Sequence, residues 1–422
     1  MRDARPDSAL GRTSDTSGTA LQRAVFQALL SHGTLTRAAI AEATGLSRIT
    51  ASGVVDQLIG QGFVVRSGAL ASTAGGPSAR AYGLAKDSAF AVGISIDGYR
   101  ITIMTANICG DIVSRHDEPI GEAELVSTTV DRAVRGEFGK LAQPLGKLAH
   151  VVIGASGVSD PDAHELAFAV NNPSWKPPLA RHLRESLRCP VGFENDVNLA
   201  ALAELRFGAG ARAHPSTPDD VRDMVLIWLD EGIACGVILN GRLYSGQAGW
   251  AGEIAFLPMP VTGGADFVAG TQETHVSTTQ RSIGTRGLQA LAQTHGLDDE
   301  TVLRHAAPPF GAPNELDAAR SELVARIARA VAGPAFLFDP DLVVLAGRTA
   351  RLGGEPLLQQ VRESLATIGP APARLALGET GSDAIVTGAM LLALVRARDE
   401  LFDEPATDAG TEPASGRESR SA

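Results

Sequence analysis

Short apolar runs alternate with helical patterns through most of this chain. From Phe90 onward, runs such as AFAVGISI, AHVVIGA, DMVLIWL and DLVVLAG are separated by helical patterns such as ALARHLRESL and NLAALAEL. This alternation predicts an α/β fold with partly parallel sheets. The dipeptides Asp97-Gly98 and Asn240-Gly241 each stand between two strand-like runs and predict hairpin turns. Two such strand-turn-strand units indicate two lobes of similar plan.

The segment before Phe90 has a different pattern, that of two short helices joined by a turn. Thr36 can N-cap a helix that carries Ile40, and Gly45 suits the end of that helix. Ser47 then precedes RITASGVVDQLIGQG, whose apolar residues form one stripe and leave polar side chains on another face. This order of elements predicts a helix-turn-helix.

The next stretch predicts a wing beside these helices. Phe63-Val64-Val65 is a short β-type run, SGALASTAGGPSAR is a loop, and Ala81-Tyr82-Gly83-Leu84 can return as the partner strand. In a winged helix-turn-helix the second helix enters the major groove, and basic wing residues meet phosphates or the minor groove. The alternative is a small helical domain that binds protein. The side chains expected to contact DNA are Thr36, Ser47, Arg48, Thr50, Ser52, Gln57, Arg66 and Arg80.

The charge distribution favours the DNA interpretation for this segment alone. Residues 1–85 carry eight arginines against five acidic residues, although the whole chain has a net charge of −11. A total charge hides local fields, and only the N-terminal part has the sign that attracts phosphate.

The chain is also too long for one hydrophobic core, because cores rarely grow beyond about 250–300 residues and this chain has 422. We expect a disordered N-terminus at residues 1–18, a winged helix-turn-helix at 19–86, a two-lobed domain at 87–398 and a disordered acidic tail at 399–422. The three cysteines have no CxxC spacing, which fits the reducing cytosol. The longest apolar run, AIVTGAMLLALV, is too short to span a bilayer, so a cytoplasmic protein without a membrane partner is predicted.

Several stretches resemble the ROK family of repressors and sugar kinases. LSRITASGVVDQLIGQGF is similar to the recognition stretch LSRATVSRIVDELIEAGL of ROK regulators, with Gly53 where arginine is common. NNPSWKPPLARHL, FENDVNLAALAE and GQAGWAGEIAF are similar to three motifs of the kinase-like domain, in the family's order. The resemblance implies a winged helix-turn-helix followed by an actin-like, two-lobed sugar-kinase fold from about Ala89 to Arg398.

The same resemblance implies a sugar pocket. Paired carboxylates and amides suit the adjacent hydroxyl groups of a sugar. Each residue also has a structural alternative: Asn195 or Asp196 can cap a helix, Asn171 can open a turn, and the glutamates can be solvated. The residues that fall on sugar-contacting positions of the family are Asn171, Asn195, Asp196, Glu253 and Glu273.

The phosphate loops depart from the kinase pattern. The family's first loop reads D-x-G-G-T, whereas here Ser95 replaces the acid, Asp97 the first glycine and Tyr99 the threonine. The second loop, G-T-G-I-G in the family, reads DEGIA here, and VVLAGRTARLG keeps only Gly347 of a glycine pair. Added carboxylates repel phosphate. The sequence therefore predicts that ATP binding and kinase activity are lost, which leaves Asp196 as a vestigial general-base position.

Zinc is not expected either. Many relatives carry a cysteine cluster and a histidine, but the matching span, Gly264 to Thr271, has no cysteine and Phe256 replaces the histidine. We therefore expect no metal and no cofactor.

These features predict a transcriptional regulator, in the repressor class, of carbohydrate metabolism genes. It would bind operator DNA and a sugar or sugar-derivative effector, as a homodimer or homotetramer and not as an enzyme. Two alternatives remain open. One is a sugar kinase with a fused DNA-binding domain, and the other is a regulator whose large domain serves only for ligand-free dimerisation.

Overall fold

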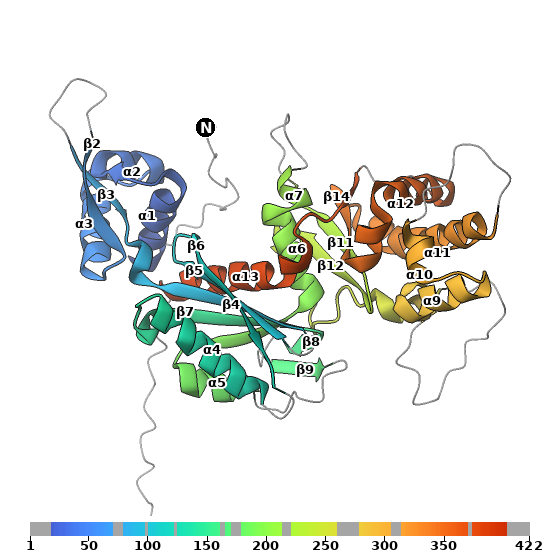
Figure 1. Cartoon of the computed structure of the whole chain (residues 1–422). Coiled ribbons are helices and arrows are strands. Elements are labelled where there is room, and N and C mark those ends of the chain that lie inside the picture. Colours follow the sequence, from blue (N-terminus) through green and yellow to red (C-terminus); the bar gives the residue numbers. More distant parts are fainter. Residues whose placement is uncertain are drawn as a thin grey trace, which may run out of the picture. The chain divides into compact units, whose positions relative to one another are not determined.

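The protein is described here from a computed structural model. The structure describes residues 18–70, 79–97, 100–121, 125–160, 165–169, 179–212, 221–259, 278–304, 314–369 and 374–402. The chain divides into two compact units, the first made of Met1–Ser88 with Arg396–Ala422 and the second of Ala89–Val395 (Figure 1).

In its described part, the first unit contains the helices α1 to α3, the end of α13 and a small antiparallel sheet, an order of elements consistent with the predicted DNA-binding domain. Its core comes from side chains on all three helices, among them Phe26, Ile40 and Leu58, which are fully buried. The sheet has the order β1-β3-β2. The elements are α1 (Gly18–His32), β1 (Leu35–Thr36), α2 (Arg37–Thr44), α3 (Arg48–Gly60), β2 (Val64–Leu70) and β3 (Ala79–Leu84).

The helix boundaries follow from local hydrogen bonds. Thr36 caps α2 by accepting the Ala39 N–H at 3.2 Å, and Ser47 caps α3 by accepting the Thr50 N–H at 3.1 Å. Gly45 ends α2 in the left-handed conformation, with φ 69°. Both caps and the glycine turn are those predicted from the sequence.

The end of the last helix belongs to this first unit. Helix α13 (Ala384–Glu400) is followed by Phe402, which is 3% exposed and packs edge-on to Phe26 with ring centroids 5.4 Å apart. Residues 399–402 were predicted to be part of the disordered tail, and this prediction is wrong because Phe402 adds an aromatic ring to the core of the unit. At the other end, α1 already includes Gly18. Residues 1–17 and 403–422 lie outside the described residues.

The second unit contains two five-stranded sheets of the same topology. Each begins with an antiparallel three-stranded meander and continues with two parallel strands, in the orders β10-β7-β4-β5-β6 and β13-β12-β11-β14-β15. The first sheet comprises β4 (Phe90–Asp97), β5 (Arg100–Asn107), β6 (Ile112–Pro119), β7 (Leu148–Ala155) and β10 (Val191–Asn195). The second comprises β11 (Met224–Leu229), β12 (Ile233–Leu239), β13 (Arg242–Leu243), β14 (Leu342–Ala346) and β15 (Leu375–Leu377).

Both predicted hairpins are confirmed by strand register. Asp97 pairs with Arg100 across the β4–β5 connection, and Leu239 pairs with Arg242 across the β12–β13 connection. In the second turn Asn240 and Gly241 both have positive φ, 53° and 73°, as a two-residue hairpin of this kind requires. A separate two-stranded sheet pairs β8 (Gly157–Asp160) with β9 (Glu165–Ala169).

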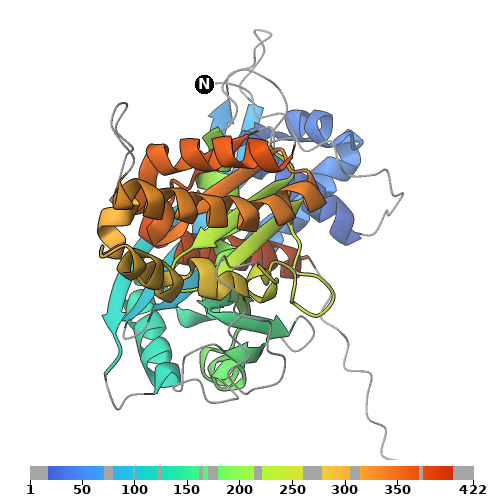
Figure 2. The same cartoon turned by 90° about the vertical axis from the view of Figure 1, so that its right-hand side faces the viewer.

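Helices cover both faces of each sheet. Helices α4 (Val126–Lys140) and α5 (Leu179–Leu187) pack on one face of the first sheet, and α11 (Glu315–Phe338) and α12 (Gly347–Ile368) on one face of the second (Figure 2). The inner faces are covered by α13 on the first sheet and by α6 (Asp196–Phe207) on the second. The remaining helices are α7 (Ala209–Arg212), α8 (Thr278–Ile283), α9 (Thr285–Thr294) and α10 (Asp299–Arg304).

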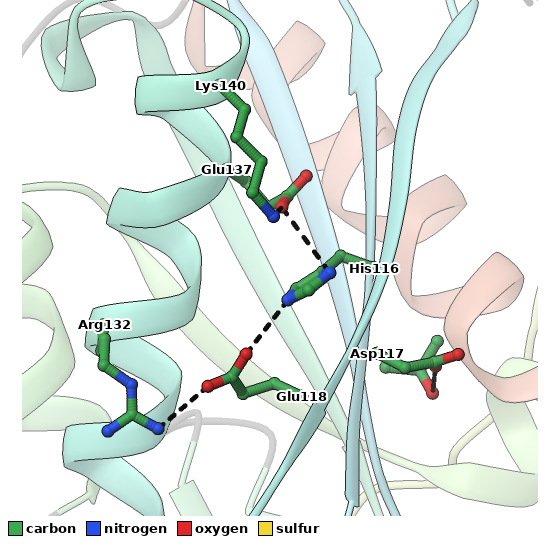
Figure 3. Close-up of polar contacts among 7 residues, drawn as sticks. His116, Asp117, Glu118, Arg132, Glu137 and Lys140 are labelled. Carbon is green, nitrogen blue, oxygen red and sulfur yellow. Dashed lines mark hydrogen bonds and ion pairs between the residues drawn. The ribbon is translucent and has the colours of Figure 1, made fainter.

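A chain of charged side chains fastens α4 to the edge strand β6. His116 lies between two carboxylates, 3.1 Å from Glu118 and 3.9 Å from Glu137 (Figure 3). Arg132 and Lys140 on α4 complete the row, at 3.0 Å from Glu118 and 2.6 Å from Glu137. The Glu137 side chain is buried and has little contact with water, so the positive charge of Lys140 stabilises its carboxylate.

Among the described residues, no helix is long and apolar enough to cross a membrane.

Helix α13 packs at backbone distance against two neighbours. A Cβ at Gly93 of β4 would collide with the Met390 backbone nitrogen, and one at Gly388 would collide with the Leu199 carbonyl oxygen of α6. Neither glycine has a positive φ, so space alone excludes a side chain at these positions. The first sheet, α13 and α6 therefore form one continuous packed stack.

We expect the Gly388→Ala variant to lose about 3 kcal/mol of unfolding free energy, because its methyl group would force α13 away from α6. Gly136→Ala on α4 is the matched control. No atom lies within 4 Å of its added Cβ, so the better helix propensity of alanine should stabilise the protein by about 0.5–1 kcal/mol. Urea unfolding of both variants measures the difference, and equal stability of the two would contradict the packing described here.

Candidate ligand site and DNA-binding surface

Asp196 stands where two parallel strands end side by side. Strand β10 pairs with β7 so that Asn195 lies opposite Ala155, and the residues that follow, Asp196 and Ser156, emerge at the same edge of the sheet. The Ser156 hydroxyl donates a hydrogen bond to Oδ2 of Asp196. The carboxyl ends of parallel strands are the usual location of ligand sites in α/β folds. The sequence interpretation singled out Asp196 but missed Ser156, whose place directly after the run AHVVIGA was the available signal.

Asn195 caps a helix, the structural alternative to a sugar contact. Its side-chain oxygen accepts the N–H groups of Val197 at 2.9 Å and Asn198 at 3.1 Å and so caps α6. Its amide nitrogen donates to the Gly157 carbonyl at 2.9 Å. Glu194 supports the same turn by accepting from the Asn195 N–H at 3.0 Å. These bonds use the polar atoms of Asn195, so its predicted contact with a sugar remains a prediction.

Glu253 approaches Asp196 from a different part of the chain. It follows Gly252, whose φ of 91° and close contact with the Cys235 carbonyl allow no side chain, and the Cys235 N–H donates to the Gly252 carbonyl at 2.8 Å. This contact holds the turn against β12. Burial, and secondly the charge of Asp196, raise the pKa of the Glu253 carboxyl. The charge of Asp196 acts on the Glu253 carboxyl, so the two groups are near enough to interact electrostatically.

The pKa of Asp196 is also raised, because burial disfavours its charged form more than its hydrogen bonds favour it. The Ser156 hydroxyl and the Val197 N–H, 2.8 Å from Oδ1, oppose the shift. Two partly buried carboxyls with raised pKa values are unfavourable for folding and are typical of functional sites.

The other predicted sugar contacts, Asn171 and Glu273, lie outside the described residues, as does the span from Gly264 to Thr271 where relatives carry cysteines. Phe256 is described and is 43% exposed. Its ring packs edge-on to Trp250, 53% exposed, with centroids 6.0 Å apart. Sequence reasoning missed Trp250, although it stands in the GQAGWAGEIAF motif three residues before Glu253.

The second phosphate loop is closed by one of its own carboxylates. Oδ2 of Asp230 accepts the backbone N–H of Arg348 at 2.9 Å, and Oδ1 accepts the N–H of Glu231 at 3.0 Å. Arg348 is the second residue of α12, whose first segment ends at the non-helical Gly354, so this carboxylate accepts a backbone N–H at the start of that short segment. The Arg348 guanidinium is turned to α10 and pairs with Asp299 at 3.0 Å.

The same loop is fixed from its other side. Gln280 on α8 accepts the Ile233 N–H at 2.9 Å and donates to the Glu231 carbonyl at 2.7 Å. Gly347, the one glycine retained from the third nucleotide element, has φ 89°, and a Cβ there would lie 2.5 Å from the Leu229 carbonyl oxygen. Its retention is explained by packing and needs no nucleotide. Of the first loop, Gly98 and Tyr99 lie outside the described residues.

The start of α3 forms an exposed surface on the first unit. Arg48 and Ile49 follow the Ser47 cap, and Ile49 is 87% exposed. The sequence interpretation did not select Ile49, because an apolar residue in an amphipathic helix is expected to be buried. Arg66 and Arg80 are exposed on the two strands of the wing.

Two other predicted DNA contacts are engaged inside the unit. Ser52 accepts a hydrogen bond from Arg37, which also pairs with Asp56 and lies 5.1 Å from the ring centroid of Tyr82. Gln57 accepts a hydrogen bond from Gln22 on α1 at 3.4 Å. Thr36 and Ser47 cap helices through their hydroxyl oxygens. Thr36, Thr50 and Ser52 are half-buried, and the exposed candidates are Ser47, Arg48, Gln57, Arg66 and Arg80.

We expect Asp196→Asn to stabilise the second unit at neutral pH. Because the folded pKa of Asp196 is raised, the folded state takes up a proton between the unfolded and folded pKa values, and stability falls as pH rises through that window. The neutral amide of asparagine removes the cost of an ionised carboxylate at this position. If that cost is about 1 kcal/mol, Tm should rise by about 2–4 °C at pH 7 and change little at pH 4. Thermal scans from pH 4 to pH 8 measure it.

Asp298→Asn is the control of opposite sign. Hydrogen bonds from Thr301 hold the pKa of Asp298 below its usual value, so its contribution to stability is present above the unfolded pKa and is lost as pH falls. A lower Tm for Asp196→Asn at pH 7 would show that the ionised form of Asp196 stabilises the fold.

Comparison with known proteins places these features in one family. The model described as ROK family matches residues 91–396. A glucokinase from Halalkalibacterium halodurans is 29% identical over 286 residues, which cover 64% of this chain and 84% of the relative. A protein named putative xylose repressor, from Caldicellulosiruptor sp., is 24% identical over 354 residues, which cover 80% of this chain and 85% of the relative.

Solved structures show the same fold. A ROK family transcriptional regulator, described as a homologue of the E. coli MLC protein, superposes with a TM-score of 0.70 at 15% identity and covers 91% of this chain and 98% of its own. Because the family match spans more than half of the sequence and includes both sheets of the second unit, this chain belongs to the ROK family.

Proposed function

We propose that this protein is a DNA-binding transcriptional repressor of carbohydrate metabolism genes, and that a sugar bound beside Asp196 and Glu253 sets its affinity for operator DNA. The observation that carries the proposal is the combination of two sites in one chain. A capped helix pair with an exposed α3 N-terminus accompanies a sugar-kinase fold whose carboxylate pair is present and whose second phosphate loop is closed by Asp230.

The extent of similarity supports the regulator over the kinase. The alignment with the relative named xylose repressor covers 80% of this chain, against 64% for the glucokinase. The alignment with the repressor, over 354 residues, is also longer than the family match at 91–396. A kinase needs no winged helix, whereas a regulator does.

The N-terminal turn of α3 has the chemistry to read bases. Arg48 can donate two hydrogen bonds to a guanine edge, and the exposed Ile49 can pack on the methyl group of a thymine. Arg66 and Arg80 on the wing strands carry charge for the backbone phosphates. One such module reads a half-site, so we infer a homodimer or homotetramer.

The paired carboxylates suit a sugar as effector. Asp196 and Glu253 present acceptors for adjacent hydroxyls, and ligand hydroxyls would satisfy groups whose pKa values burial has raised. An effector regulates DNA binding only if its affinity differs between the DNA-bound and free conformations. Release of the repressor by sugar is the direction we propose.

Two alternatives have specific observations against them. A sugar kinase has Asp196 at the position of the general base, but the carboxylate of Asp230 accepts a backbone N–H at the start of α12 and the adjacent Glu231 adds a second charge near the loop, both unfavourable for nucleotide phosphates. A ligand-free dimerisation domain has no use for two carboxyls with raised pKa values. We therefore infer that the protein is not an enzyme.

We expect Arg48→Ala to weaken operator binding about tenfold and to reduce its salt dependence, and Ile49→Ala to weaken it about fivefold, the equivalent of ~1 kcal/mol of apolar contact. The operator is first selected from random DNA with the full chain. Each dT of the operator is then replaced in turn by deoxyuridine, which removes one methyl group. At one position per half-site this replacement should weaken binding of the wild type but leave binding of Ile49→Ala unchanged.

Gln61→Ala, exposed beyond the end of α3, is the matched control and should bind like the wild type. Absence of any methyl effect would disprove the contact of Ile49 while leaving the proposed function intact. If the full chain selects no sequence at all, the proposed function fails.

We expect one member of a sugar panel to stabilise the protein and release it from the operator, with about 2.7 kcal/mol of stabilisation at 100 times its Kd. Glu253→Gln should weaken this sugar about 100-fold and keep DNA binding, because it removes one acceptor from a partly buried site. Thermal shift with and without operator measures both effects. Micromolar binding of MgATP with phosphorylation of a sugar would favour the kinase, and intact operator binding without any sugar response would favour the dimerisation domain.

A further inference from the structure

Two exposed aromatic side chains flank Glu253 in the turn that follows β13. Trp250 precedes Glu253 by three residues and Phe256 follows it by three, and their rings pack edge-on to each other. Both side chains are exposed, although large apolar side chains are more often buried. Exposed aromatic groups that lie together are typical of surfaces that bind a ligand or another protein.

The backbone places Phe256 on the same face of the turn as the Glu253 carboxyl. The Phe256 N–H donates to the Glu253 carbonyl at 3.2 Å and forms a short 3-10 helix, in which side chains three positions apart lie over one another. Ile254, 6% exposed, packs instead into the core of the second sheet. Trp250 joins the Phe256 face through its ring, and its carbonyl accepts the Glu253 N–H at 3.4 Å. One face of the turn therefore combines a carboxyl with an apolar surface.

The turn is held at both ends by the rest of the second unit. The Cys235 N–H of β12 donates to the Gly252 carbonyl at 2.8 Å. Thr279 of α8 donates to the Leu257 carbonyl, with its hydroxyl at 2.6 Å and its N–H at 3.3 Å. A surface fixed in this way loses little conformational entropy when a ligand binds.

A saccharide fits this face better than a second copy of the chain. Protein interfaces are depleted of glutamate, because burying a carboxylate without a cation is costly. The Glu253 carboxyl is already disfavoured in its charged form by burial and by the charge of Asp196, so a protein surface laid over it would add to that cost. A pyranose, in contrast, has hydroxyls around its edge for a carboxyl and C–H groups on its faces for an aromatic ring.

We propose that Trp250, supported by Phe256, is the stacking surface of the sugar site, on which the C–H face of a pyranose lies while hydroxyls at its edge bind Glu253. The inference rests on the proposed function and adds a specificity-determining residue to it. An aromatic face attracts C–H groups, but it leaves a hydroxyl that points at it without a hydrogen-bond partner. The site would therefore select sugars by which of their faces is free of hydroxyls.

The test is isothermal titration of the full chain with glucose, galactose, mannose, xylose and N-acetylglucosamine. For whichever of these sugars binds most tightly, we expect Trp250→Ala to raise Kd about tenfold and Trp250→Phe, which keeps an aromatic face, to raise it about threefold or less. Phe207→Ala is the matched control. Phe207, the last residue of α6, is 52% exposed against 53% for Trp250, and its removal should leave Kd unchanged.

Tryptophan fluorescence gives a readout that a purely structural role of Trp250 would not change. Saturation with the same sugar should alter the wild-type emission, because the ring lies on the indole. Trp250→Phe should lose this change although calorimetry still detects binding. The other tryptophans are Trp175 and Trp228, and an undiminished emission change in Trp250→Phe would come from them and overturn the proposal.

The proposal is also overturned if Trp250→Ala binds the sugar as tightly as the wild type. If this variant in addition has a smaller mass in sedimentation analysis, the rings belong to an interface between copies of the chain. Sugar binding that falls with Glu253→Gln but not with Trp250→Ala keeps the proposed function and removes only the stacking surface. If the wild type binds none of the sugars at about 10 mM, both the sugar effector and the stacking surface are wrong. Operator binding, measured in each variant, shows separately whether the DNA-binding function holds.

Discussion

The contact between α6 and α13 at Gly388 is the constraint on which the second unit depends. With no side chain at that position, α13 lies directly on the Leu199 carbonyl of α6 and, through Gly93, on the backbone of β4. The two sheets are thereby joined by two helices packed at backbone distance (Figure 1). Helix α6 then carries Asp196 at its first residue, so the candidate ligand site is held by the same packed stack.

The positions of three carboxylates, Asp196, Glu253 and Asp230, decide which ligands the second unit is suited to bind. Asp196, at the sheet edge, and Glu253 have raised pKa values and are unfavourable for folding while ionised, which is typical of functional sites. At the start of α12, Asp230 accepts the backbone N–H of Arg348, a group that could otherwise donate to a phosphate. These two placements are the basis of the proposed sugar site and of the proposed loss of nucleotide binding.

Much of the fold follows from local pattern. The caps at Thr36 and Ser47, the two hairpins and the alternation of strands and helices are all decided by residues within a few positions of one another, and each is found as predicted. The tail was predicted less well, because Phe402 is ordered by rings that lie more than three hundred residues earlier in the chain.

Local patterns predict a helix-turn-helix segment before an α/β domain of two similar lobes, and they make Asp196 and Glu253 candidates for one site. Which side chains have partners inside the protein depends on the tertiary structure. Ser52 accepts a hydrogen bond from Arg37, Gln57 stays exposed while it accepts one from Gln22, and Asp230 accepts a backbone N–H 118 residues away. The physical reason is that periodicity and capping act over one or two turns of chain, whereas hydrogen bonds between distant segments depend on how whole sheets and helices pack.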